Sequence, residues 1–167
     1  MLSFHIAPSL VVLEWEWDTS SPLLCGGTKQ VELSGENNSI ATLSTDDEED
    51  EVMLTTSEVL ESGTHRISFK ILMGDLLCLG VVRDGAVYDQ TAELLEEEST
   101  DGWFMMINSG GLYGNGKRNR PSERPGQIKD GQILTLELDT DAGTLKFWCG
   151  GEPHGTGWER GVHGRLR

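Results

Sequence analysis

The stretch most suggestive of chemistry is glycine-rich: Gly111 to Lys117 follows the pattern G-x-x-x-x-G-K of phosphate-binding loops. Such a loop needs a serine or threonine after the lysine to hold the metal ion, and a helix behind it. Arg118 stands at the hydroxyl position, and Pro121 follows in a polar stretch without helical periodicity. We therefore interpret this segment as a glycine-rich turn and predict no nucleotide site.

A second candidate is the acidic stretch Asp139 to Thr144. A calcium loop needs oxygen ligands at alternate positions through a longer loop, but Leu145 and Phe147 place apolar groups there. A phosphatase-type aspartate pair would want the threonine one residue earlier, after a buried parallel strand. The composition instead indicates a hairpin turn with Gly143 in a left-handed conformation.

The remaining reactive side chains are scattered. The histidines and cysteines are His5, His65, His154, His163, Cys25, Cys78 and Cys149. The histidines lack metal-ligand spacing, no cysteine pair forms C-x-x-C, and no serine lies in G-x-S-x-G. From these patterns we predict no catalytic centre, no metal site and no cofactor.

The net charge narrows the classes of partner. The chain has 13 basic and 28 acidic residues among 167, a formal charge of −15. Nucleic acid and anionic membranes attract cationic surfaces, so we expect neither as a partner. The first residues show neither a signal peptide nor a membrane span, and we therefore expect a cytoplasmic protein.

Six adjacent carboxylates form the densest charge run, and their mutual repulsion predicts a solvated loop. They are Asp46, Asp47, Glu48, Glu49, Asp50 and Glu51. This run either keeps the chain soluble or forms an acidic contact surface. The densest basic cluster, Lys117 to Arg124, lies in another expected loop.

Strands must position these loops, because alternation of apolar and polar residues is frequent and helical periodicity nearly absent. Alternating runs cover 10–17, 64–72, 132–139 and 144–149. The glycine content, 21 residues, supplies the turns between them. Short strands separated by such turns predict an all-β fold, an antiparallel sandwich or barrel.

The central hairpin is the most specific element that we predict. Gln132–Asp139 should pair with Thr144–Cys149 and bury one apolar row, formed by Leu134, Leu136, Leu138, Leu145 and Phe147. Trp148 is out of step with this row and should face the opposite side. Trp103 begins another strand and should lie in the core.

The order of these elements is that of a known family. A glycine before a long strand (Gly63), a small-residue strand end (Gly80), Trp103 and the hairpin Leu136–Gly151 follow one another. Over residues 38 to 160 this arrangement resembles the SPRY domain. The resemblance implies a bent antiparallel β-sandwich of two sheets with long loops, a concanavalin-like fold. We expect residues 1–37 to form an N-terminal strand and lead-in, and 38–167 the sandwich.

Two features depart from the family pattern. Cys149 stands where the family has asparagine before Gly150. The chain also stops at Arg167, where the family continues into one or two closing strands. We expect the sandwich to lack those strands, unless they come from elsewhere, and to leave an edge or apolar face open near Leu166.

The resemblance implies a non-catalytic protein–protein interaction module, part of an adaptor or larger assembly, that binds a partner segment through its loops. Tyr88 matches a loop tyrosine that contacts peptide in the most similar adaptors of the family. The run Asp46–Glu51 would favour a basic partner. The alternative is a lectin-like sandwich, for which Tyr113, Asn115, Asn119 and Asp101 could form a carbohydrate site.

Overall fold

The computed structural model describes a chain of β-strands and turns. The residues that it describes are 2–6, 23–25, 30–34, 40–44, 51–53, 55–73, 77–86, 101–114, 126–155 and 157–167. The strands are β1 (Leu2–Ile6), β2 (Leu23–Cys25), β3 (Gln30–Ser34), β4 (Ile40–Ser44), β5 (Glu51–Met53), β6 (Thr64–Met73), β7 (Cys78–Val82), β8 (Gly102–Met106), β9 (Leu112–Gly114), β10 (Ile133–Asp139), β11 (Thr144–Cys149) and β12 (Glu152–Pro153). Within these ranges there is no helix, so none that could cross a membrane.

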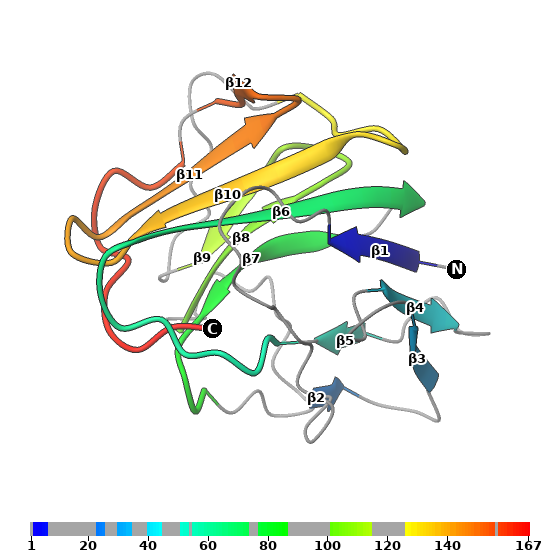
Figure 1. Ribbon diagram of the computed structural model, residues 1–167, viewed down its shortest axis with the longest axis horizontal. Coiled ribbons are helices and arrows are strands. Elements are labelled where there is room, and N and C mark those ends of the chain that lie inside the picture. Colours follow the sequence, from blue (N-terminus) through cyan, green and yellow to red (C-terminus); the bar gives the residue numbers. More distant parts are fainter. Residues whose placement is uncertain are drawn as a thin grey trace.

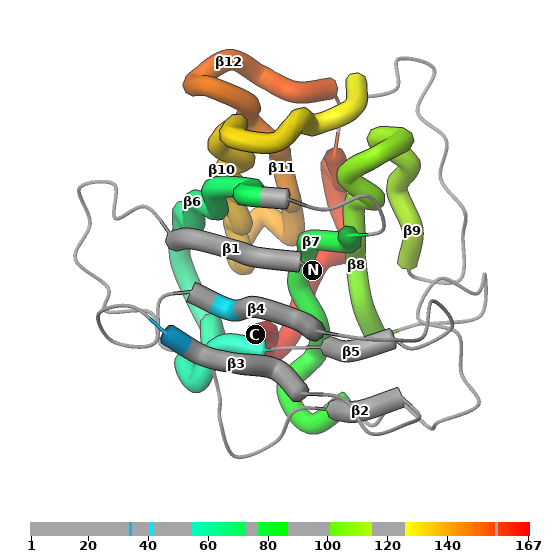
Figure 2. The backbone as a smooth tube through the Cα atoms, turned by 90° about the vertical axis from the view of Figure 1, so that its right-hand side faces the viewer, coloured from blue at the N-terminus to red at the C-terminus, as the bar shows by residue number. Residues whose placement is uncertain are grey.

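The strands form an antiparallel sandwich. One sheet has the order β12-β11-β10-β6-β1-β4-β3, another β7-β8-β9, and β2 pairs with β5. Figure 1 shows the long sheet running from β12 at the top to β3 at the bottom. In Figure 2, β6, β10 and β11 lie on one side and β7, β8 and β9 on the other. The predicted all-β sandwich is confirmed.

The core lies between these two layers. Strand β6 turns Ile67, Phe69 and Ile71 inward, as its alternation predicts, and the opposite layer contributes Trp103 and Met105. All five are buried in one apolar cluster. Burial of apolar area is the main stabilising term in folding, so the alternation along each strand decides which face meets the other sheet.

The central hairpin has the predicted register. Leu136 lies opposite Phe147 and Leu138 opposite Leu145, and the strand begins at Ile133, one residue later than predicted. The predicted apolar row is buried, while Trp148 lies on the other face and is only half-buried. Its ring lies beneath the guanidinium of Arg66, whose carbon is 5.6 Å from the ring centroid. Arg66 therefore covers part of the opposite face of β11 at Trp148.

Ser68 differs from the pattern, since it is buried although its place in the alternation puts it on the polar face. Its hydroxyl lies 2.8 Å from that of Thr135 on β10, and Thr135 lies opposite Trp148. The hydrogen bond satisfies the buried hydroxyl of Ser68. The polar side chains of Ser68 and Thr135 can therefore share one face of the sheet with the half-buried indole of Trp148.

The turn of the hairpin depends on Asp139. Its Oδ1 accepts the N–H of Ala142 at 2.8 Å, and Gly143 takes the left-handed φ of 68°. The hairpin turn is confirmed. The hydrogen bond from Ala142 holds the pKa of Asp139 below its ordinary value of 3.8, and that from Thr64 acts in the same direction.

We predict that this carboxylate makes stability depend on pH. A carboxylate whose pKa is lowered by folding stabilises the folded state at pH values above its unfolded-state pKa. This stabilisation is lost as pH falls through its folded-state pKa. The stability difference between the native chain and Asp139→Asn should be largest near neutral pH and shrink below about pH 4. Urea unfolding at pH 7, 4 and 2.5 measures it. Asp141→Asn, in the same turn and exposed, is the control; a difference for Asp139→Asn that stays constant with pH would contradict the prediction.

The segment after β12 closes the sandwich on one side. Trp158 exchanges backbone hydrogen bonds with Leu145, and Val162 and Leu166 are buried in the core. Leu60 and Leu166 also exchange hydrogen bonds, of 2.7 and 3.0 Å. The prediction of an open edge or apolar face near Leu166 is therefore wrong, because this segment itself takes a strand position beside Leu60.

Candidate interaction surface

Most of the predicted contact residues fall outside the described ranges. Tyr88 and Asp46–Asp50 lie there, and the predicted run 10–17 does too. Glu51 is described: it opens β5 and lies opposite Cys25. Its place in a loop is therefore corrected to a strand, while the role of all these residues in binding stays a prediction.

The structure does describe the two ends of the segment that carries Tyr88. We call Arg83–Ala86 and Asp101–Trp103 the loop root, since they enclose residues 87–100. Val82 on β7 lies opposite Gly102 on β8, and the N–H of Arg83 donates to the carbonyl of Asp101 at 2.8 Å. The two ends of the segment are thus held side by side by the sheet.

Side chains reinforce the loop root. The Arg83 Nε lies 3.2 Å from Asp101 Oδ1, and its guanidinium carbon lies 5.3 Å from the ring centroid of Trp103. Its Nη1 donates to the carbonyl of His163 at 3.1 Å. Trp103 is completely buried, as predicted, so the guanidinium is positioned against a fixed ring. A cation over an aromatic face and beside a carboxylate is stabilised by both.

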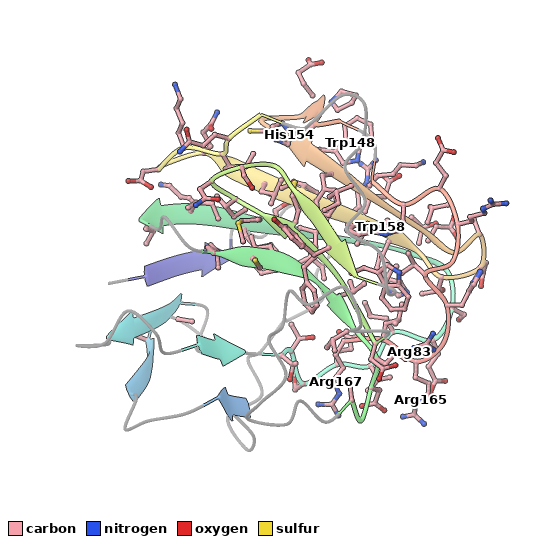
Figure 3. All side chains as sticks on the ribbon, turned by 180° about the vertical axis from the view of Figure 1, so that it is seen from behind. Arg83, Trp148, His154, Trp158, Arg165 and Arg167 are labelled. Atoms are coloured by element: carbon pink, nitrogen blue, oxygen red, sulfur yellow. The ribbon has the colours of Figure 1, made fainter. Side chains whose placement is uncertain are left out.

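A second cluster of charges lies beside the root. Asp84 receives two arginines: Arg167 Nε at 2.7 Å from Oδ1 and Arg165 Nη2 at 3.2 Å from Oδ2. Arg165 also pairs with Glu61, at 3.2 Å. Figure 3 shows Arg83, Arg165 and Arg167 gathered at one end of the molecule, away from Trp148 and His154. Sequence reasoning missed this cluster because the partners of each ion pair are more than 80 positions apart, and no local pattern pairs them.

Two of the histidines considered above lie within hydrogen-bond distance of backbone carbonyls. His65 Nε2 lies 2.7 Å from the carbonyl of Ser62, and His154 Nε2 lies 2.8 Å from that of Gly126. Burial raises the pKa of the Cys149 thiol above its ordinary 9.0, which keeps it protonated at neutral pH. In the described part of the chain, no three acidic, histidine or cysteine side chains gather as a metal site would require.

The glycine-rich stretch begins as a strand rather than as a phosphate loop. Leu112–Gly114 forms β9, which pairs with β8. A Cβ at Gly114 would overlap the carbonyl of Gly102, so the glycine permits close approach of the two strands. The predicted glycine-rich turn is therefore corrected to a strand over Leu112–Gly114, and residues 115–118 lie outside the described residues.

The carbohydrate alternative gains little from the geometry. Asp101 is paired with Arg83, and Tyr113 is half-buried within β9. Asn115 and Asn119 lie outside the described residues. One oxygen of the Asp101 carboxylate already pairs with Arg83 at the loop root.

A small, mostly apolar pocket lies beside β12. Its volume is about 150 Å³, and Trp148, Pro153 and Trp158 supply much of its lining. Lys146 and Glu159 also border it. In Figure 3, Trp148 lies away from Arg83, and Trp158 lies between them.

Comparisons with known proteins define the class of fold. The chain has the fold of a SPRY domain, a β-sandwich with antiparallel sheets. It superimposes on the crystal structure of the SPRY domain of human HERC1 with a TM-score of 0.56 and 24% sequence identity, over 68% of this chain and 69% of that one. No family model matches the sequence, and no curated protein matches it.

Proposed function

We propose that this chain is a non-catalytic protein–protein interaction module, which binds a segment of a partner protein through loops at one end of its sandwich. The observation that carries the proposal is the loop root on a SPRY-type fold: hydrogen bonds, an ion pair and a buried indole hold both ends of residues 87–100. A rigid scaffold that fixes loop ends lets the loops vary for recognition without cost to the core.

The chemistry of the sequence suggests the kind of partner. A net charge of −15 and the run Asp46–Glu51 favour a basic protein or peptide over nucleic acid or an anionic membrane. Tyr88, two residues after the loop root, offers an aromatic anchor of the type that dominates binding energies in interfaces. A cytoplasmic adaptor or larger assembly is the setting that we propose.

The test begins with affinity capture from a cytoplasmic lysate, followed by kinetics with the recovered partner. Neutralising Asp46 to Glu51 should slow association about 10-fold at low salt and flatten its salt dependence, because rim charges act on encounter. Tyr88→Ala should speed dissociation by about 30-fold, corresponding to loss of an anchor worth about 2 kcal/mol.

Two controls separate these effects from general changes in the protein. Neutralising the exposed acids Asp141, Glu152 and Glu159 removes charge elsewhere on the surface and should leave most of the salt dependence. Tyr88→Phe keeps the ring and should retain most of the residence time. Unchanged rates in both the acidic-run variant and Tyr88→Ala would place the contact surface elsewhere.

A further inference from the structure

The segment Arg165–Arg167 lies between two other parts of the sheet structure, and we call it the inserted segment. On one side Leu166 exchanges backbone hydrogen bonds with Leu60. On the other side Arg167 exchanges them with Val82, and the N–H of Asp84 donates to the carbonyl of Arg165. These bonds are 2.7 to 3.0 Å long. The chain end lies beside β7 in Figure 1.

The surroundings of this segment contact its side chains as well as its backbone. Leu166 is completely buried in the main apolar cluster. Its two neighbours point to acids: Arg165 pairs with Glu61 and Asp84, and Arg167 pairs with Asp84. The space therefore accepts an extended backbone with one apolar side chain between two cations.

We propose that this space is a strand-binding site for a partner peptide of the pattern basic–apolar–basic, and that the inserted segment occupies it as an internal competitor. Insertion of a strand between two others is an established mode of peptide recognition, in which backbone bonds give affinity and side-chain pockets give specificity. The charge complementarity is already visible, since Glu61 and Asp84 face the cations of the internal ligand.

Occupation of this site also affects the loop root. Arg83 and Asp84 belong to the root, and both contact residues 163–167. Exchange of the inserted segment for a partner strand would break the contact of Arg83 Nη1 with His163 unless the partner reproduced it. Peptide binding at this site therefore competes with the contacts by which residues 163–167 support the loop root. The site shares Arg83 and Asp84 with the loop root, but it is tested with a peptide of this chain and not with the partner recovered by affinity capture, so failure of one proposal can be told from failure of the other.

The direct test uses the full chain and the labelled peptide Gly-Val-His-Gly-Arg-Leu-Arg, which copies residues 161–167. Tethering gives the internal segment a high effective concentration, so the native chain should bind the peptide weakly. Leu166→Ala empties the apolar part of the site, and the peptide should bind this variant at least about 10-fold more tightly, measured by fluorescence anisotropy.

Matched controls test the chemistry of the site. Peptides with glutamate in place of both arginines, or alanine in place of the leucine, should each lose about 10-fold in affinity. Asp84→Asn on the Leu166→Ala background should weaken binding of the original peptide to a similar extent. Equal binding of all three peptides would overturn the proposal.

A second variant covers the case in which Leu166→Ala does not fold. Arg167→Ala leaves the apolar side chain in place and removes one pair to Asp84. Amide hydrogen exchange at Leu60, Val82 and Asp84 should then speed up at least 10-fold relative to the β10–β11 amides, because the inserted segment opens locally. Exchange of these amides only by global unfolding would overturn the proposal. The proposal would also be overturned if the native chain forms a dimer, Leu166→Ala does not, and neither binds the peptide. A second copy of the chain would then be the occupant.

Discussion

Replacement of Phe147 by alanine is expected to lower the free energy of unfolding by about 3–5 kcal/mol. Phe147 is 1% exposed, lies opposite Leu136 in the hairpin, and its ring centroid is 6.2 Å from that of Trp158. Removal of the ring loses apolar burial and leaves a cavity that the surrounding β-strands cannot readily fill. Urea unfolding monitored by tryptophan fluorescence and circular dichroism measures the change.

The neighbouring residue on the same strand supplies the control. Lys146 has a side chain that is 56% exposed and pairs with Glu137 at 3.6 Å. Such a pair contributes about 0–1 kcal/mol, so Lys146→Ala should cost little. A loss below 1 kcal/mol for Phe147→Ala would mean that the β10–β11 hairpin is peripheral to the core, contrary to its place in the sheet.

The same hairpin shows which parts of the fold a sequence can predict. Strands β6, β10 and β11 have one face toward the core, and their side chains therefore alternate in hydrophobicity. Strand β8 is buried at four successive positions, Gly102 to Met105, so it has no alternation to detect. Strands β2, β5 and β12 have two or three residues, which is too short for any periodicity.

The candidate sites were harder to predict for a different reason. The run Arg165-Leu166-Arg167 alternates, but three residues carry no distinctive signal. Its neighbours in space, Leu60 and Val82, are more than 80 positions away in the sequence. Only closure of both sheets brings Glu61 and Asp84 to its arginines, so the sequence alone suggested an open edge there. Tyr88 could be proposed because the family resemblance supplied it.

At some glycines, neighbouring backbone atoms leave no room for a side chain. Gly80 on β7 is the clearest example. A Cβ at this position would overlap the carbonyl oxygen of Trp103 and lie 2.8 Å from the Cα of Phe104, both on the paired strand β8. A side chain can rotate away from an overlap, but a backbone carbonyl within a sheet ladder cannot do so without displacing the strand.

We expect Gly80→Ala to destabilise the domain by about 3 kcal/mol, the upper part of the range for overpacked sites, because β7 and β8 must separate locally. Thermal unfolding should show a fall in Tm of about 6–12 °C for a chain of this size. The separation would also disturb the loop root, since Arg83 and Asp101 continue the same strand pair. Amide exchange at Arg83 should therefore rise with that of β8.

Gly126→Ala is the control, because Gly126 is exposed and its Cβ would meet nothing within 4 Å. If both variants unfold at the same temperature, β7 and β8 do not approach as closely as the structure requires. The close pairing of these strands would then no longer support the loop root.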